Sequence, residues 1–184
     1  MRVVSGDAGG RKLVAPPGAD TRPTSDRVRE ATFNALGSLH AIDDANVLDL
    51  FAGSGAMGIE ALSRGAAHAT FVERDRGARD AIERNLAATG FAAQAAIVAA
   101  DAVAWAVGQC GAFDLAICDP PYTFARWIEL LGALAVPLAV LESGHEVDPG
   151  EGWEVVRVKR YGTTVVTIAR RTRPPAQHAQ EAAP

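Results

Sequence analysis

Residues 49–58 have the sequence DLFAGSGAMG, in which Gly53, Gly55 and Gly58 follow the G-x-G-x-x-G spacing. The apolar run 46–51 leads into these glycines and a helix-like stretch, 56–65, follows them. They therefore occupy a predicted strand-to-helix turn, where the lack of side chains lets a ligand approach the backbone closely. This arrangement predicts a cofactor site, but several classes of cofactor use such a loop.

Asp49 separates these classes, because it lies at the end of the predicted strand, four residues before Gly53. A dinucleotide would place its pyrophosphate at the N-terminus of the following helix, and a nearby carboxylate would repel it. S-adenosylmethionine carries an ammonium and a sulfonium, which the same carboxylate attracts. We therefore assign Asp49, Phe51, Gly53 and Gly55 to binding of this methyl donor.

Two further acids end the next two predicted strands. Glu73 follows Asp49 by 24 residues (73 − 49), close to the roughly 20 expected for an acid that binds ribose hydroxyls. This spacing suits NAD and S-adenosylmethionine equally. Asp101, directly before Ala102, lies where an acid could accept the adenine amine. Each of the three acids also has a structural alternative, such as capping a helix.

Apolar runs and helix-like stretches alternate through the middle of the chain. This alternation predicts an α/β fold with a mainly parallel sheet covered on both faces. A helix capped by Ser25 or Asp26, a small N-terminal hairpin and an antiparallel C-terminal pair turning near residues 161–162 flank this core. The predicted core strands are 46–51, 68–73, 95–100, 113–119 and 136–142, and the predicted core helices are 56–65, 75–90, 102–109 and 124–134.

The length of 184 residues suits one compact unit with a substantial core. We divide it into an N-terminal hairpin and helix extension (1–38), a methyltransferase domain (39–173) and a disordered tail (174–184). The sequence has neither a run of about 18 apolar residues nor the apolar core of a signal peptide, so we expect a cytoplasmic protein. Cys110 and Cys118 are expected to be reduced and structural.

Positive charge gathers near the two ends of a chain whose net charge is −4. Residues 157–173 hold six of the 18 basic residues and no acid, and residues 1–30 hold six more against four acids. Such patches suit phosphate backbones, whereas the alternative is a solvated strand and tail. The candidate RNA-binding residues are Arg22, Arg27, Arg157, Arg170 and Arg171.

The stretch CDPPYTF (118–124) ends another predicted core strand. Asp119 precedes a proline and is held extended, and Pro120 and Pro121 stiffen the loop. The Asp119 carboxylate and the Pro120 carbonyl form an acceptor pair suited to the exocyclic amine of a nucleobase, whose lone pair they can orient. Tyr122 offers a face on which an extruded base stacks. A rigid loop with a core tyrosine is the structural alternative.

Four stretches together resemble the RsmD-type methyltransferases, which act on guanine N2 of bacterial 16S ribosomal RNA. They are RPTSDRVREATFN (22–34), VLDLFAGSGAMGIEALSRGA (47–66), NL (85–86) and DPPY (119–122). The resemblance covers residues 2 to about 170 and implies a Rossmann-like, class I S-adenosylmethionine-dependent fold with seven strands and a terminal antiparallel hairpin. It also implies that the partner is an assembled or assembling small ribosomal subunit. We expect a monomer without a metal.

The resemblance also implies roles for individual residues. Asp49, Gly53 and Gly55 would hold the methionine portion of the donor, Glu73 its ribose and Asp101 its adenine, while residues 119–122 form the catalytic loop. Arg22 and Arg27 would contact RNA phosphate or the cofactor carboxylate, or brace the loop. The tail 177–184 has no counterpart in the family.

Other functions stay open at this point. Adenine-N6 methyltransferases of DNA or RNA also carry D-P-P-Y loops, although 184 residues leave no obvious target-recognition domain for sequence-specific work on DNA. A non-catalytic assembly factor that binds S-adenosylmethionine would keep the glycine loop. A nicotinamide-dependent reductase is disfavoured by Asp49.

Overall fold

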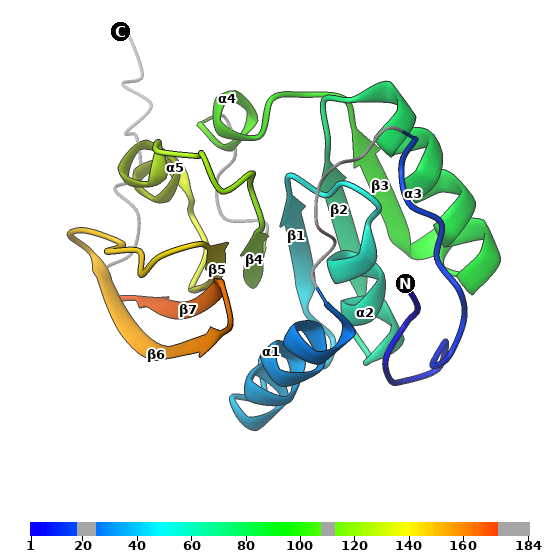
Figure 1. Ribbon diagram of the computed structural model, residues 1–184, viewed down its shortest axis with the longest axis horizontal. Helices are drawn as coiled ribbons and strands as arrows, with labels where there is room; N and C mark the ends of the chain where they lie inside the picture. The colour runs from blue at the N-terminus through cyan, green and yellow to red at the C-terminus, as the bar shows by residue number, and fades with distance from the viewer. Residues whose placement is uncertain (18–24, 108–112, 173–184) are drawn as a thin grey trace, which may run out of the picture.

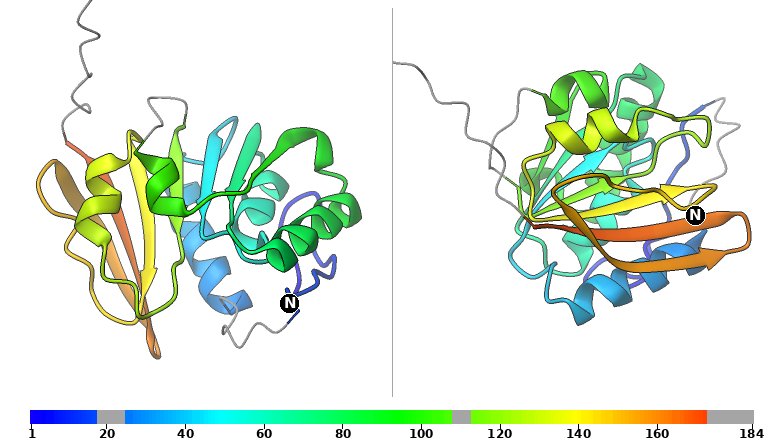
Figure 2. Two further views of the ribbon diagram at one scale, coloured as in Figure 1. Left: turned by 90° about the horizontal axis from the view of Figure 1, so that it is seen from above. Right: turned by 90° about the vertical axis from the view of Figure 1, so that its left-hand side faces the viewer.

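A seven-stranded sheet forms the centre of the molecule, with helices on both faces (Figures 1 and 2). This computed structural model describes residues 1–17, 25–107 and 113–172. The strands are ordered β3-β2-β1-β4-β5-β7-β6 across the sheet. Their bounds are β1 Asn46–Leu50, β2 His68–Val72, β3 Ala95–Val98, β4 Leu115–Cys118, β5 Leu138–Ser143, β6 Trp153–Tyr161 and β7 Thr164–Arg171.

The helices alternate with the core strands, as the sequence predicts. Ser25 caps the first of them by accepting a hydrogen bond from the Val28 N–H. The helix predicted over 124–134 begins later, because the Phe124 N–H donates to the Pro121 carbonyl in a turn. The bounds are α1 Asp26–Ser38, α2 Ala56–Ser63, α3 Arg76–Thr89, η1 Ala92–Gln94, α4 Ala102–Ala106 and α5 Trp127–Ala133. No helix in the described residues is long and apolar enough to cross a membrane.

The chain order reverses beside β1. The first three strands step outward from β1 through β2 to β3, and the chain then returns to place β4 on the other side of β1. The pairs β2–β3, β1–β2, β1–β4 and β4–β5 are all parallel. In open α/β sheets, ligands bind at the carboxyl ends of the strands where this reversal occurs. The fold thus predicts a binding site above β1 and β4.

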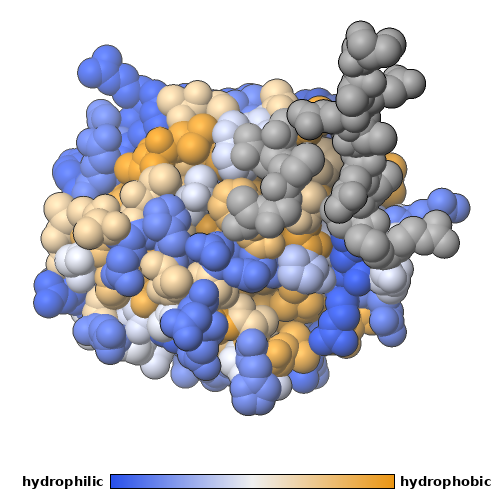
Figure 3. All heavy atoms as spheres, turned by 180° about the vertical axis from the view of Figure 1, so that it is seen from behind, coloured by the Kyte–Doolittle hydropathy of each residue, from blue (hydrophilic) through white to orange (hydrophobic). Residues whose placement is uncertain are grey.

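Two apolar cores fill the space between the sheet and its helices. One contains Phe33 of α1 and Ile59 of α2, and the other contains Leu130 of α5 and the buried thiol of Cys118. Cys118 is free, as expected, and burial raises the pKa of its thiol; Cys110 lies outside the described residues. On the surface seen from behind, hydrophilic and hydrophobic side chains are interspersed (Figure 3).

The antiparallel strands β7 and β6 complete one edge of the sheet, seen toward the viewer in Figure 2, right. Because β7 runs against β5, with Val165 opposite Ser143, it begins where the parallel strands end. The tip of the β6–β7 hairpin therefore lies at the carboxyl edge of the parallel sheet. Arg170 pairs with Leu138 at the opposite edge, about 20 Å from Thr164 at 3.3 Å per residue.

The predicted N-terminal hairpin is present as a short antiparallel pairing around the Arg2–Lys12 bridge, in which the Val3 N–H donates to the Arg11 carbonyl and the Leu13 N–H donates to the Met1 carbonyl. The N–H groups of Val4 and Ser5 do not pair with another strand, because both donate to the Glu60 carboxylate on α2. Side chains of α2 thus replace the neighbouring strand, and the segment lies against this helix rather than forming a free-standing ribbon.

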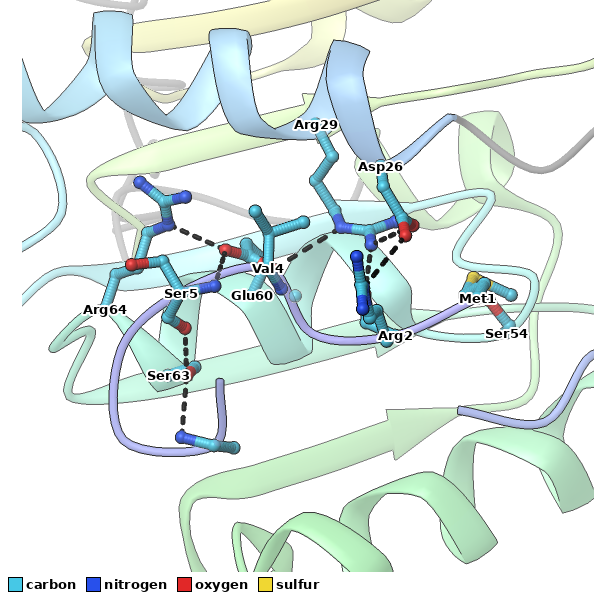
Figure 4. A network of polar contacts seen from close by, with 12 residues as sticks. Met1, Arg2, Val4, Ser5, Asp26, Arg29, Ser54, Glu60, Ser63 and Arg64 are labelled. Carbon is cyan, nitrogen blue, oxygen red and sulfur yellow. Dashed lines mark hydrogen bonds and ion pairs between the residues drawn. The ribbon is translucent and has the colours of Figure 1, made fainter. Parts of the chain in front are cut away.

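A buried ion pair joins α1, α2 and the N-terminal segment (Figure 4). The Arg29 Nε lies 3.4 Å from a Glu60 oxygen, and both side chains are fully buried. Glu60 also binds Arg64 at 2.7 Å, and Arg29 binds Asp26 at 2.8 Å and the carbonyl of Arg2. Arg29 is one of the six basic residues counted in segment 1–30, and its burial removes it from any basic surface there.

We expect Glu60→Gln to lower the free energy of unfolding by up to about 3–5 kcal/mol, because it removes the buried carboxylate that faces the Arg29 guanidinium and leaves the half-exposed Asp26 as the carboxylate beside that buried charge. Urea denaturation monitored by circular dichroism measures this change. Glu129→Gln is the matched control, since the Arg126–Glu129 pair is exposed and such pairs contribute little. Equal destabilisation by the two substitutions would contradict the structural role of the Arg29–Glu60 pair.

Candidate active site

The glycine loop leaves β1 through a strained turn. Phe51, Gly53 and Gly55 all have positive φ angles, of 60°, 56° and 75°. Positive φ is costly for a phenylalanine, and such strain gathers at functional sites. At Gly55, a Cβ would also lie 3.2 Å from Ile82 and 3.3 Å from Phe71. Backbone conformation and space therefore both favour glycine there.

Asp49 lies beneath this loop with an exposed fraction of 1%. Its Oδ2 accepts a hydrogen bond of 2.8 Å from the Gly58 N–H in α2. Burial raises the pKa of Asp49 well above its ordinary value, the Gly58 N–H opposes this rise, and the charges of Asp119 and Glu73 add to it. The three carboxylates are therefore close enough to interact, and they form an acidic region that suits a cationic ligand.

Glu73 connects β2 to the glycine loop. One carboxylate oxygen accepts the Gly53 N–H at 2.9 Å, and the other accepts the Asp75 N–H at 2.9 Å. The side chain is half-buried, and a carboxylate has lone pairs for more than two donors. Its position beside the loop fits the predicted contact with ribose hydroxyls, which remains a prediction.

Asp101 caps α4, the structural alternative noted in the sequence. Its Oδ1 accepts the N–H groups of Val103 and Ala104, both at 3.1 Å. Its Oδ2 lies 3.8 Å from the Arg74 guanidinium. Ala102 is buried in the first turn of the same helix. The cap does not occupy all of the acceptor sites of Asp101, so binding of an adenine amine stays a prediction.

The D-P-P-Y loop begins directly beside the glycine loop. Leu50 at the end of β1 pairs with Cys118 at the end of β4, so Phe51 and Asp119 leave the sheet from neighbouring positions. Asp119 is half-buried and Pro120 is buried. Phe124 contacts Phe51 edge-on, with ring centroids 5.2 Å apart, and Phe124 also contacts Trp127 at 5.1 Å. This aromatic row joins the two loops.

Tyr122 is directed toward the C-terminal hairpin. Its hydroxyl lies 2.6 Å from the Thr164 Oγ1, and either group can donate. The side chain is 44% exposed, and a Cβ on Gly144 would lie 3.4 Å from its ring. Tyr122 thus has a fixed hydroxyl and an accessible ring, which is compatible with the predicted stacking role.

Four of the five predicted RNA-binding residues lie in the described part of the chain. Arg27 on α1 and Arg157 and Arg170 on the hairpin are exposed, whereas Arg22 lies outside the described residues. Arg171 donates to the carbonyls of Leu131 and Leu134, and its guanidinium carbon lies 4.5 Å from the Trp153 ring centroid. Burial lowers the pKa of Arg171. Its contacts are those of a packing residue, so its role in RNA binding is the least supported of the five.

The family model described as "Conserved hypothetical protein 95" matches residues 1–170. The chain is 44% identical, over 185 residues, to the Putative rRNA methyltransferase YlbH of Bacillus subtilis, covering 93% of this chain and 99% of that relative. It is 43% identical, over 122 residues, to the Ribosomal RNA small subunit methyltransferase D of Escherichia coli (strain K12). The chain belongs to the RsmD family.

The match to the Escherichia coli RsmD spans 66% of this chain and 60% of that relative. A solved structure, "Putative methyltransferase yhhF from Escherichia coli", is 36% identical and superposes with a TM-score of 0.81, covering 93% of this chain and 97% of that chain. The sheet order and this likeness identify the Rossmann-like fold of class I S-adenosylmethionine-dependent methyltransferases.

Asn85 is a structural link of this RsmD-family chain to which sequence reasoning gave no role. Its buried amide exchanges hydrogen bonds with the Val14 backbone, accepting at 2.8 Å and donating at 3.0 Å, and also donates to the Ser54 carbonyl at 2.8 Å. It thus joins the N-terminal segment to the glycine loop. The available signal was a polar residue, Asn85, directly before the apolar Leu86 in the helical pattern. This signal could not identify the partners of Asn85, because Val14 and Ser54 are distant in sequence.

We expect Asp49→Asn to stabilise the protein without donor while weakening donor binding. The asparagine oxygen can still accept the Gly58 N–H, but it carries no charge. Because the pKa of Asp49 is raised on folding, the folded state holds more protons than the unfolded state as pH rises above the ordinary value, and stability falls. The substitution removes this loss, so the melting temperature should rise by about 2–4 °C for each kcal/mol gained.

Thermal unfolding between pH 4 and pH 8 tests this expectation, with the difference between variant and wild type growing as pH rises. Titration calorimetry with S-adenosylmethionine measures the accompanying decrease in affinity. Asp80→Asn, at an exposed position of α3, controls for the removal of one charge. A constant difference in stability across the pH range would disprove the effect assigned to Asp49.

Proposed function

We propose that this protein transfers a methyl group from S-adenosylmethionine to the exocyclic N2 amine of a guanine in small-subunit (16S) ribosomal RNA. The observation that carries the proposal is the parallel pairing of β1 with β4. It sets the acidic glycine loop beside the D-P-P-Y loop at the reversal point of the sheet, so a donor and an acceptor bound at these loops would be neighbours. An assembled or assembling small ribosomal subunit is the proposed substrate particle.

The donor set at the glycine loop suits the proposed cofactor. Asp49 and Glu73 are acids at the ends of neighbouring strands, and their charges favour a ligand that carries an ammonium and a sulfonium. Phe51, Gly53 and Gly55 would line the methionine side of the donor, with Glu73 at the ribose and Asp101 with Ala102 at the adenine. When bound, S-adenosylmethionine supplies an electrophilic methyl group on a positively charged sulfur.

Asp119 and the Pro120 carbonyl would hold the hydrogens of the guanine amine and direct its lone pair. Orientation of this kind can supply up to about 7–11 kcal/mol of a barrier. The Asp119 carboxylate would also receive the proton that the amine loses. Tyr122, whose ring is accessible, would stack on the extruded base, and stacking of this kind contributes about 1–3 kcal/mol to binding. Pro121 stiffens the loop, since its carbonyl accepts the Phe124 N–H at 2.8 Å.

The name of the Bacillus relative supports ribosomal RNA as the substrate, and that of the Escherichia coli relative supports RNA of the small subunit. The leading alternative is the N6 amine of adenine, because a relative from Shewanella putrefaciens, 36% identical over 90 residues, is named as a tRNA1(Val) adenine-N6-methyltransferase. That match covers 47% of this chain, against 93% for the Bacillus relative. The wider match favours ribosomal RNA.

We expect Asp119→Ala to reduce methyl transfer by at least about 100-fold, the lower range for removal of a group that handles a proton, while donor binding is retained. Labelled S-adenosylmethionine and small-subunit particles from cells that lack this protein provide the assay, and nucleoside mass analysis identifies the product. Asp114→Ala, at an exposed site before β4, is the control. Product in adenine would favour the alternative substrate. Donor binding without transfer by the wild-type protein would indicate an assembly factor.

We expect charge reversal at Arg157 or Arg170 to weaken particle binding and to lower the slope of log affinity against log salt by about 0.7–0.9 for each phosphate that the protein no longer neutralises. Both side chains are exposed on the hairpin. Arg84→Glu is the matched control, because Arg84 is exposed on α3, which packs beside β3, the strand at the other edge of the sheet. Filter binding at several salt concentrations measures the effect. Equal behaviour of Arg157→Glu, Arg170→Glu and Arg84→Glu would mean that the hairpin is only a solvated face.

A further inference from the structure

We propose that Thr164 is a positioning residue for the target base, because its hydroxyl holds the Tyr122 ring in the orientation that receives the base. This inference rests on the proposed function and adds to it a residue outside the D-P-P-Y loop. Thr164 is the first residue of β7 and is buried, with an exposed fraction of 8%. Its Oγ1 lies 2.6 Å from the Tyr122 hydroxyl across 42 residues of sequence.

The Tyr122 ring is restricted at both of its ends, by the loop backbone and by the hydrogen bond to Thr164. At one end, Tyr122 follows two prolines, which restrict the backbone from which the side chain leaves. At the other end, the para hydroxyl is bonded to a strand whose neighbours pair along its whole length, from Thr164 to Arg171. Between the ends, the ring edge borders the backbone at Gly144. The ring is thus oriented before a base arrives.

Orientation of the Tyr122 ring in advance affects binding of the base rather than the methyl-transfer step. A free tyrosine would lose rotational freedom when a base stacks on it, and holding the ring in advance reduces that entropic cost. The hydroxyl bond lies at the far end of the ring from the loop backbone, so its removal leaves Asp119 and the acceptor carbonyl in place. We therefore expect a rise in the KM for particles of about threefold to tenfold, with an unchanged affinity for the methyl donor.

Thr164→Val and Tyr122→Phe each remove one partner of the bond with little change of shape. Each single variant and the double variant should show the same rise in KM, because all three remove the same single hydrogen bond, and Thr164→Ser should restore the wild-type value. Thr167→Val is the matched control on the same strand. The Thr167 hydroxyl is buried and has no hydrogen-bond partner within the described part of the chain, so its removal should leave KM unchanged.

A second measurement does not depend on transfer. The chain has two tyrosines, so fluorotyrosine labelling gives two fluorine resonances, and Tyr161→Phe assigns them. Thr164→Val should shift the Tyr122 resonance, whereas Thr167→Val should not. If wild-type protein modifies the particles but Thr164→Val keeps the wild-type KM or leaves the Tyr122 resonance in place, the positioning role is refuted. If wild-type protein transfers no methyl group, the proposed function itself fails.

Discussion

Parallel pairing between β1 and β4 brings together two loops that are separated by about 70 residues of sequence. Since the chain leaves β1 in one direction across the sheet and returns on its other side, no helix or strand separates Phe51 from Asp119 at the carboxyl edge. The apolar ends of the two strands, Leu50 and Cys118, are buried. Every proposed role at the site depends on this register, because a slip of one residue would turn the acids to the opposite face of the sheet.

The site is also built from groups that oppose folding. Asp119 and Glu73 each repel an ionised Asp49, and Asp49 has lost its hydration. The Gly58 N–H offsets part of this cost, and a bound cation would offset more. The glycine loop adds the strain of Phe51, whose ring packs against Phe124 in return. A site of this kind is more stable with its ligand than without it, which couples donor binding to order in the loop.

Much of this arrangement could be predicted from local patterns. Strand ends, the Ser25 cap and the acids that follow the strands are short-range signals, and the structure contains each of them. Contacts between distant segments could not be predicted in this way. Arg29 has the same charge as its exposed neighbour Arg27, and only the packing of α1 against α2 shows that it is buried. Thr164 is one of two threonines in β7, and nothing local assigns it to Tyr122.

These long-range contacts give the active loops their rigidity. The glycine loop is held from below by Asp49 and from the side by Asn85, which also binds the N-terminal segment. That segment in turn is fixed to α2 by Glu60. On the other side, Tyr122 ties the D-P-P-Y loop to the C-terminal hairpin. The N-terminal segment and the C-terminal hairpin therefore both support the centre of the sheet, where a donor and a base would have to meet within bonding distance.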